Sequence, residues 1–327
     1  MKYCFSVALI LGAFAFAKEV ALLEPTDVTI EQVDAGPFEE KPAVIEEIEL
    51  ADPNFKLKSP GLAVGLSAVL PGLGNAYLGD YRTGGSIFGT STAMYTSAIV
   101  GAAVESGEIT VSSLVAAQNT WFYGMYAAYR DARAYNRDFG YTYPMPNESF
   151  KDLSLASFQW SVISKPEVWG GVLGALAVGA TLSHLMSTDE DKKDEPTLSK
   201  DGKLFPLAAF PVGIGEETFF RGFLMPACTE MWGPRMGLIV SSVAFGLVHV
   251  PNGYMMKPKQ RARYYALGIP FITASGAYMG WMVQKNSSLK ESVAYHSWYD
   301  FVLFAASYSA TSSISNQKPT FAFSCSF

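Results

Sequence analysis

The chain has 327 residues, of which 49% are hydrophobic and only 17% are charged, whereas a soluble domain carries about 25% charged residues. This balance argues against an ordinary soluble enzyme and is typical of a membrane protein. The net charge of −6, without basic clusters of the kind that bind nucleic acid, predicts no nucleic-acid partner. Three scattered cysteines are too few for a disulfide framework or a cysteine-based zinc site.

Residues 1–17 have the pattern of a cleaved signal peptide. Lys2 supplies a short positive region, Phe5 to Phe14 form an apolar stretch, and Ala15-Phe16-Ala17 matches a cleavage site. The apolar stretch is too short to span about 30 Å of hydrocarbon as a helix. We therefore expect this segment to be removed rather than to act as an anchor.

Residues 18–59 are predicted to form an acidic, disordered arm that begins outside the cytoplasm. Between Lys18 and Phe55 there are eleven acidic residues and two basic ones, together with four prolines and little apolar periodicity. Such a composition cannot bury enough apolar surface to fold. The arm is interpreted as a solubilising linker, and a binding arm for a basic partner is the alternative.

From Pro60 onward, apolar stretches alternate with short polar breaks, which predicts an all-α, polytopic transmembrane helical bundle with about eight membrane segments. Met236–Val250 is short and is expected to lie inside the bundle rather than against lipid. Ser149–Ile163 mixes aromatic and polar residues and is expected to be an interfacial helix. The expected membrane segments are Gly61–Leu78, Gly84–Val104, Thr110–Tyr129, Pro166–Met186, Leu204–Met231, Met236–Val250, Arg263–Val283 and Leu289–Ala310.

These segments divide into an N-terminal membrane region, 60–186, and a C-terminal domain, 204–312. A charged linker, 187–203, separates the two, and a tail, 313–327, follows. Each of the two regions is expected to be a four-helix bundle. In the first expected segment, Pro71, Gly72 and Gly74 predict a broken helix hairpin, with a ligand site at the break as the alternative.

Charge does not decide the orientation in the membrane. Arg130, Arg133 and Arg137 favour the cytoplasm for one loop, and the basic residues of 257–263 favour it for another. With one crossing per segment, the two loops fall on opposite sides. Either one segment is re-entrant or one loop breaks the rule.

Three ionisable residues interrupt the apolar run from Leu204: Glu216, Glu217 and Arg221. An ionisable group near the centre of a membrane segment costs at least ~2.5–3.5 kcal/mol, so it needs a partner or a function. Glu217 and Arg221 are four residues apart and can pair on one helix face. Glu216 points about 100° away from Glu217 and has no partner on its own helix.

Two later segments carry further polar residues. His249 lies at the end of a short apolar helix, and His296 and Asp300 share one face of another. Burying these groups separately would cost several kcal/mol each, so we expect them to converge with Glu216 in one polar pocket. The third histidine, His184, is interpreted as a satisfied core residue.

Such a pocket can support hydrolysis in two ways. Glu216 beside imidazoles can take a proton from water and make a nucleophile for a carbonyl carbon. Alternatively, His249, His296 and Glu216 can hold a divalent metal such as zinc, which activates bound water. No cofactor is otherwise indicated. The chain has no serine-hydrolase elbow and no H-E-x-x-H helix.

The three pieces resemble the motifs of the CAAX-protease and bacteriocin-processing (CPBP, Abi) family of intramembrane proteases. These motifs, E-E-x-x-x-R, F-x-x-x-H and H-x-x-x-N/D, occur here in order as Glu216 to Arg221, Phe245 to His249 and His296 to Asp300. The resemblance covers about Leu204–Ala310, so 204–312 is expected to be a CPBP-like protease domain.

The resemblance implies a role for each motif residue. Glu216 would be the general base, assisted by His249. His296 and Asp300 would orient water or stabilise the oxyanion. Glu217 and Arg221 would form a structural ion pair. Because eukaryotic-type members have Asn at position 300, and an ionised Asp cannot donate a hydrogen bond, Asp300 fits a role in orienting His296 or binding metal better.

The function expected from these observations is an intramembrane endopeptidase that acts on a membrane-associated protein or peptide. A non-catalytic membrane adaptor or immunity-type protein with the same fold is the alternative. The expected location is the lipid bilayer of a bacterial inner (cytoplasmic) membrane, in which the chain is an integral protein.

Overall fold

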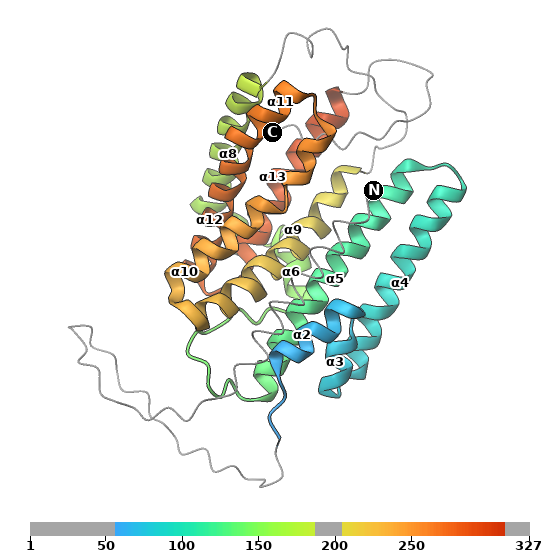
Figure 1. The fold of residues 1–327 in the computed structure, drawn as a ribbon, viewed down its shortest axis with the longest axis vertical. Helices are drawn as coiled ribbons and strands as arrows, with labels where there is room; N and C mark the ends of the chain where they lie inside the picture. The colour runs from blue at the N-terminus through green and yellow to red at the C-terminus, as the bar shows by residue number, and fades with distance from the viewer. Residues whose placement is uncertain (1–55, 187–204, 311–327) are drawn as a thin grey trace, which may run out of the picture.

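The computed structural model describes residues 56–186 and 205–310, which form helices and their connections (Figure 1). No strand occurs in these two ranges, so the all-α fold class is confirmed for them. The predicted signal peptide 1–17, linker 187–203 and tail 313–327 lie outside the described residues. The same holds for the acidic arm up to residue 55.

In the first range the helices are α2 (Pro60–Val69), α3 (Leu73–Leu78), α4 (Tyr81–Ala103), α5 (Gly107–Tyr135), α6 (Phe150–Ala156), α7 (Trp160–Ile163) and α8 (Pro166–Met186). In the second range they are η2 (Phe205–Ala208), α9 (Ala209–Glu217), the π-helix η3 (Thr218–Leu224), α10 (Met225–Leu247), η4 (Val250–Met255), α11 (Pro258–Arg263), the π-helix η5 (Tyr264–Gly268), α12 (Ile269–Asn286) and α13 (Lys290–Ala310).

The predicted broken hairpin is present between α2 and α3. Gly72 turns the chain with a φ of 82°, a conformation that favours glycine. A side chain at Gly72 would also collide with the carbonyl oxygen of Gly84. Lys58 Nζ, just before α2, donates to the carbonyl oxygen of Tyr77 on α3 at 3.0 Å. The two pieces therefore fold back on each other, and the segment does not cross as one helix.

Helix α5 is the centre of the N-terminal region. It packs along α4, and it also contacts α2, α9 and η3. Asp80 and Ser106 cap the N-termini of α4 and α5 by accepting from Thr83 N at 2.9 Å and Ile109 N at 3.4 Å. Because α5 lies against both halves of the chain, it connects the N-terminal region to the C-terminal one.

The expected interfacial helix, Ser149–Ile163, is instead two short helices, α6 and α7. On one continuous helix, Trp160 would share a face with Leu153 and Ala156, which are buried. The break after Ala156 turns the chain, so that Trp160 is exposed while Val162 packs into the core. Burial of Val162 and exposure of Trp160 therefore require two helices.

Helix α8 packs on α13 and η5, whereas the sequence grouped it with the N-terminal helices. Gly171 makes this possible, because a side chain there would press on the rings of Tyr278 and Tyr295. The prediction for His184 is wrong, because this histidine is exposed on α8 rather than buried in the core. It takes no part in the cluster described below.

The run from α9 to α10 is interrupted at Gly233, where φ is 82° and ψ is 165°. It therefore consists of a first leg, 209–232, and a second leg, 234–247. This break matches the predicted boundary between Leu204–Met231 and Met236–Val250. The second leg is not enclosed as predicted, since Ile239, Val243 and Leu247 are exposed. These residues recur every four positions, so one face of this leg contacts α12 and the opposite face points outward.

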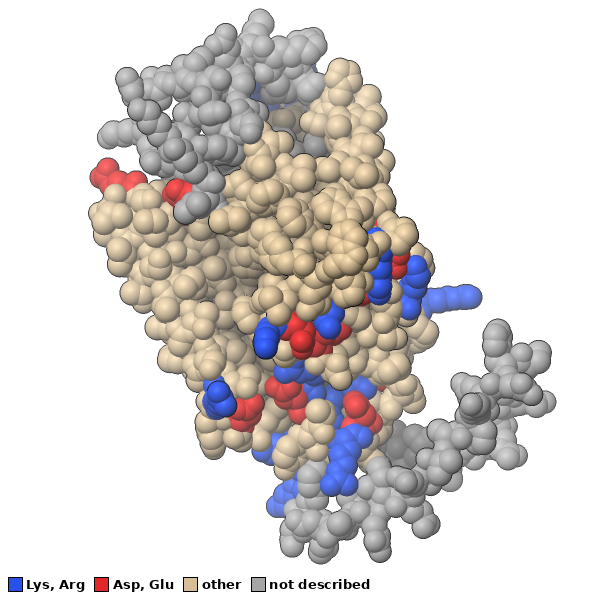
Figure 2. Space-filling model, turned by 180° about the vertical axis from the view of Figure 1, so that it is seen from behind, with Lys and Arg blue, Asp and Glu red and all other residues tan. Residues whose placement is uncertain are grey.

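Three helical runs of the described residues are long and apolar enough to cross a membrane: Pro166–Leu185, Phe205–Tyr254 and Pro258–Asn286. The predicted number of eight segments is not confirmed. Figure 2 shows that most charged side chains of one face lie in its lower part, with a few acidic ones near the upper left edge and a broad uncharged area between them. Such an area suits contact with hydrocarbon, and the chain is an integral membrane protein.

The two basic loops lie at opposite ends of the helices (Figure 1). Asn136, beside the first loop, donates from Nδ2 to the carbonyl oxygen of Lys58 at 2.7 Å, and Lys58 lies just before α2. Arg263, in the second, donates to Leu185 O at 3.1 Å near the end of α8. One of the two loops therefore departs from the positive-inside rule.

Candidate active site

Helix α9 carries Glu216 and Glu217 and packs closely against two neighbouring helices, α5 and α13. A side chain at Gly213 would collide with Ser297 of α13, and one at Gly215 would collide with Asn119 of α5. Small residues permit this close approach between membrane helices. Neither glycine was singled out from the sequence, although Gly215 directly precedes Glu216 and Gly213 lies three positions before it. They bring the glutamates within reach of α13.

Glu217 and Arg221 form an enclosed ion pair. Arg221 Nη1 lies 2.8 Å from Glu217 Oε1, and both side chains have no exposed surface. The guanidinium carbon of Arg221 also lies 4.3 Å from the centre of the Phe245 ring. Gly276 of α12 covers the pair, since a side chain there would press on Arg221. The contact expected from the four-residue spacing is therefore present and shielded from solvent.

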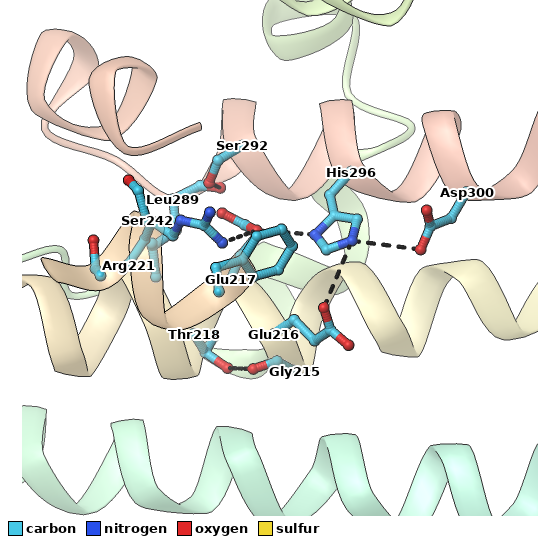
Figure 3. Close-up of polar contacts among 12 residues, drawn as sticks. Gly215, Glu216, Glu217, Thr218, Arg221, Ser242, Leu289, Ser292, His296 and Asp300 are labelled. Carbon is cyan, nitrogen blue, oxygen red and sulfur yellow. Dashed lines mark hydrogen bonds and ion pairs between the residues drawn. The ribbon is translucent and has the colours of Figure 1, made fainter. Parts of the chain in front are cut away.

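His296 links this pair to the other carboxylates (Figure 3). Its Nδ1 lies 2.9 Å from Glu217 Oε1, and because a carboxylate oxygen accepts, Nδ1 is the donor. Its Nε2 lies 3.4 Å from Asp300 Oδ2 and 3.9 Å from Glu216 Oε2. The side chains of Glu216 and Asp300 are 18% and 16% exposed. Unlike Glu217, they are accessible to a reactant.

His249 lies just after α10 and is held by two backbone contacts. Its Nδ1 lies 2.7 Å from the carbonyl oxygen of Phe245, so Nδ1 carries the proton and Nε2 is the free acceptor of the neutral ring. Tyr264 donates its hydroxyl proton to the carbonyl oxygen of His249 at 3.0 Å. The Phe245 ring lies 4.9 Å from the His249 ring and 5.7 Å from the His296 ring, centre to centre. Phe245 therefore contacts both imidazoles.

The candidate residues from three separate motifs are thus brought together. Glu216, His296 and Asp300 are in direct proximity, and His249 contacts the Phe245 ring, which also contacts His296. The contact between Glu217 and His296 was not expected from the sequence. The sequence indicated only that the Glu217 carboxylate can accept more hydrogen bonds than Arg221 supplies. Helix periodicity predicts neighbours on the same helix and gives no information about a second helix.

Among residues 56–186 and 205–310, no group of three or more His, Cys, Asp or Glu side chains is arranged to hold an ion. We therefore derive no catalytic step through a metal. The Nδ1 atoms of His249 and His296 each face a protein oxygen, so Nε2 is the nitrogen that each ring would offer to an ion, as in most metal-binding histidines. The zinc alternative therefore stays a prediction.

Residues 202–302 match the family model described as type II CAAX prenyl endopeptidase Rce1-like. This match confirms the resemblance to the CAAX-protease group for about a third of the chain. No curated protein matches the chain, and no solved structure does. The matched range contains every residue of the cluster: Glu216, Glu217, Arg221, Phe245, His249, His296 and Asp300.

Proposed function

We propose that the protein is an intramembrane endopeptidase that hydrolyses a peptide bond of a membrane-associated protein or peptide. The observation that carries this proposal is the difference between two adjacent glutamates. Glu217 is sealed against Arg221, while the Glu216 carboxylate is accessible and lies 3.9 Å from His296 Nε2. The family match over residues 202–302 supports the same activity class.

In the proposed reaction, Glu216 accepts a proton from water while the water oxygen attacks the carbonyl carbon of the substrate. His249 orients this water by accepting its second hydrogen at Nε2. The negative charge that develops on the carbonyl oxygen is stabilised by a hydrogen bond donated from His296 Nε2–H when that ring is doubly protonated, and the proton stays on the ring. When the carbon–nitrogen bond breaks, the leaving amine takes the proton from Glu216.

Glu217 and Asp300 act on His296 in this mechanism. Glu217 accepts from Nδ1 at 2.9 Å and fixes the direction of the ring. Asp300 lies 3.4 Å from Nε2 and holds this atom towards the accessible side. Arg221 balances the charge of Glu217, so that this carboxylate stays fixed. These roles need no hydrogen bond donated by Asp300, in keeping with Asp rather than Asn at this position.

The matched family is described by its action on CAAX prenyl proteins. For this chain we propose the broader class of membrane-associated proteins or peptides, because neither the prenyl group nor the CAAX end can be derived from its residues. We propose the bacterial inner membrane as its location, on the basis of the predicted signal peptide. A non-catalytic adaptor or immunity-type protein is the alternative function.

The test compares new protein N-termini in membranes of cells that carry the native chain or Glu216→Gln at equal abundance. The matched control is Glu167→Gln, which makes the same change in the surface ion pair with Lys285, 2.9 Å apart. We expect a set of cleavage sites to vanish in Glu216→Gln and to persist in the control. Purified native chain should then cleave peptides that span those sites.

An unchanged set of N-termini in Glu216→Gln across several growth conditions would favour the adaptor.

A further inference from the structure

The loop 136–149, which connects α5 to α6, touches the helices that carry the candidate catalytic residues. It lies outside the range 202–302 that matches the family. Its contacts reach one end of α13, which bears His296 and Asp300, and one end of the first leg of α10. That leg continues the helix that bears Glu216 and Glu217. The N-terminal region therefore meets the catalytic cluster through this loop.

The contact with α13 is made by Glu148. Its Oε1 accepts a hydrogen bond from the backbone N–H of Leu289 at 3.2 Å, directly before α13 begins at Lys290. Both residues are buried, Glu148 with 9% and Leu289 with 0% of its surface exposed. The first N–H groups of a helix have no partner within it, and a negative charge there is favourable. Glu148 supplies both the acceptor and the charge.

Glu148 is itself held firmly on α5. Its carbonyl oxygen accepts from Arg130 Nη1 at 2.7 Å and from the hydroxyl group of Tyr126 at 3.2 Å. Arg130 is fixed in turn by Asp131, with 2.7 Å between Nε and Oδ1. Glu148 therefore joins α13, through its side chain, to α5, through its backbone carbonyl oxygen.

The contact with the first leg of α10 is made by Glu230. Its carboxylate accepts from the backbone N–H of Tyr143 at 2.8 Å and from that of Thr142 at 3.1 Å. Arg133 Nη1 of α5 lies 3.5 Å from the same carboxylate. The loop therefore binds the helix of Glu216 at one point and the helix of His296 at another.

We propose that Glu148 is a positioning residue for the reaction. It acts through Leu289 on α13 and fixes the distance between His296 Nε2 and Glu216 Oε2, which is 3.9 Å. A displacement of about 1 Å can cost about 100-fold in rate when reacting groups must be aligned. This inference rests on the proposed peptidase function and extends it, because it gives the N-terminal region a part in the chemistry.

The catalytic test uses the full-length purified chain with Glu148→Ala, Glu148→Gln and a control, Asp152→Asn. Asp152 is a partly exposed carboxylate that accepts no hydrogen bond from α13 and caps its own helix, α6, through Ser149. The substrate is a peptide that spans a cleavage site found in the comparison of N-termini. We expect Glu148→Ala to lower kcat by about 10- to 100-fold and to change KM by less than about twofold.

Glu148→Gln should recover most of the rate, because its amide oxygen can still accept from the N–H of Leu289. Asp152→Asn should leave both constants unchanged. A loss in Glu148→Ala that Gln does not recover, or that appears in KM rather than in kcat, overturns the proposal.

The second test does not depend on catalysis. Amide hydrogen exchange over the first turns of α13 should be faster in Glu148→Ala and native in Glu148→Gln. Native exchange in Glu148→Ala overturns the proposal whether or not the chain is active. If the native chain cleaves no peptide, the proposed function fails. The exchange measurement then decides by itself whether Glu148 holds α13.

Discussion

Two neighbouring groups of ionisable side chains meet at the helix formed by α9 and η3. The two groups differ in how far their side chains are exposed. Glu217 and Arg221 form a sealed group with no exposed surface. Glu216, with His296 and Asp300 from α13, forms an open group whose carboxylates are 18% and 16% exposed. Adjacent positions in the sequence thus have opposite environments, because neighbouring residues of a helix point about 100° apart.

His296 connects the two groups. Its Nδ1 lies 2.9 Å from the sealed carboxylate and its Nε2 faces the open ones. A change in the sealed group should therefore lower folding stability first and activity as a consequence. A change in the open group should lower activity alone. The following predictions test this division, from the largest expected effect to the smallest.

Glu217→Ala should lower the free energy of unfolding by about 3–5 kcal/mol, because Arg221 is left buried and unpaired. The measurement is thermal unfolding of purified protein together with abundance in the membrane. The matched control is Glu167→Ala, whose partner Lys285 is 46% exposed; this change should cost no more than ~1 kcal/mol. An abundant, active Glu217→Ala protein would contradict the sealed-pair assignment.

Glu216→Gln should lower the rate of peptide cleavage by about 10²–10⁴-fold, the usual contribution of a general base. Its unfolding temperature should remain close to the native one, since the glutamine keeps the size of the side chain and loses only an accessible charge. Activity on a purified peptide and thermal unfolding of the same sample check both parts. A fall in stability as large as that of Glu217→Ala would remove the distinction between the two groups.

Asp300→Asn should change the cleavage rate by less than about tenfold, because asparagine keeps an oxygen that can accept a hydrogen bond near His296 Nε2. Asp300→Ala has no such oxygen and should lose more activity. Comparing kcat of the two variants at equal abundance tests the orienting role. Equal losses in both variants would indicate that the charge of Asp300 is what matters.

If Glu216 acts as the general base without a metal, removal of metal should have no effect on cleavage. Purified protein should contain far less than one equivalent of zinc, measured by elemental analysis, and should cleave its peptide in the presence of a chelator. About one equivalent that disappears in His249→Ala, together with loss of activity under chelation, would revive the metal-assisted mechanism.

The sequence predicted the local features that depend on composition and spacing. The apolar runs identified the long helices, and the φ of 82° at both Gly72 and Gly233 lies where glycine interrupts those runs. The four-residue spacing of Glu217 and Arg221 identified a pair that the structure contains at 2.8 Å. These features could be predicted because each depends on the backbone geometry of one helix or one turn.

Other features could not be derived from one segment at a time. The sequence treated Ser149–Ile163 as one helix and His184 as buried, and it placed α8 with the N-terminal helices. Each error concerns which face of an element meets another element. That choice is made by packing, as when Gly171 admits the rings of Tyr278 and Tyr295.

The sequence by itself determined an all-helical membrane chain with three motifs of ionisable residues in apolar segments. Only the tertiary structure decided that Glu217 is shared between Arg221 and His296, that Glu216 stays accessible, and that Glu148 of the N-terminal region reaches the start of α13. The physical reason is the range of the interactions. Helix periodicity and turn geometry act over a few residues, whereas the packing of α5, α9 and α13 joins side chains more than a hundred positions apart.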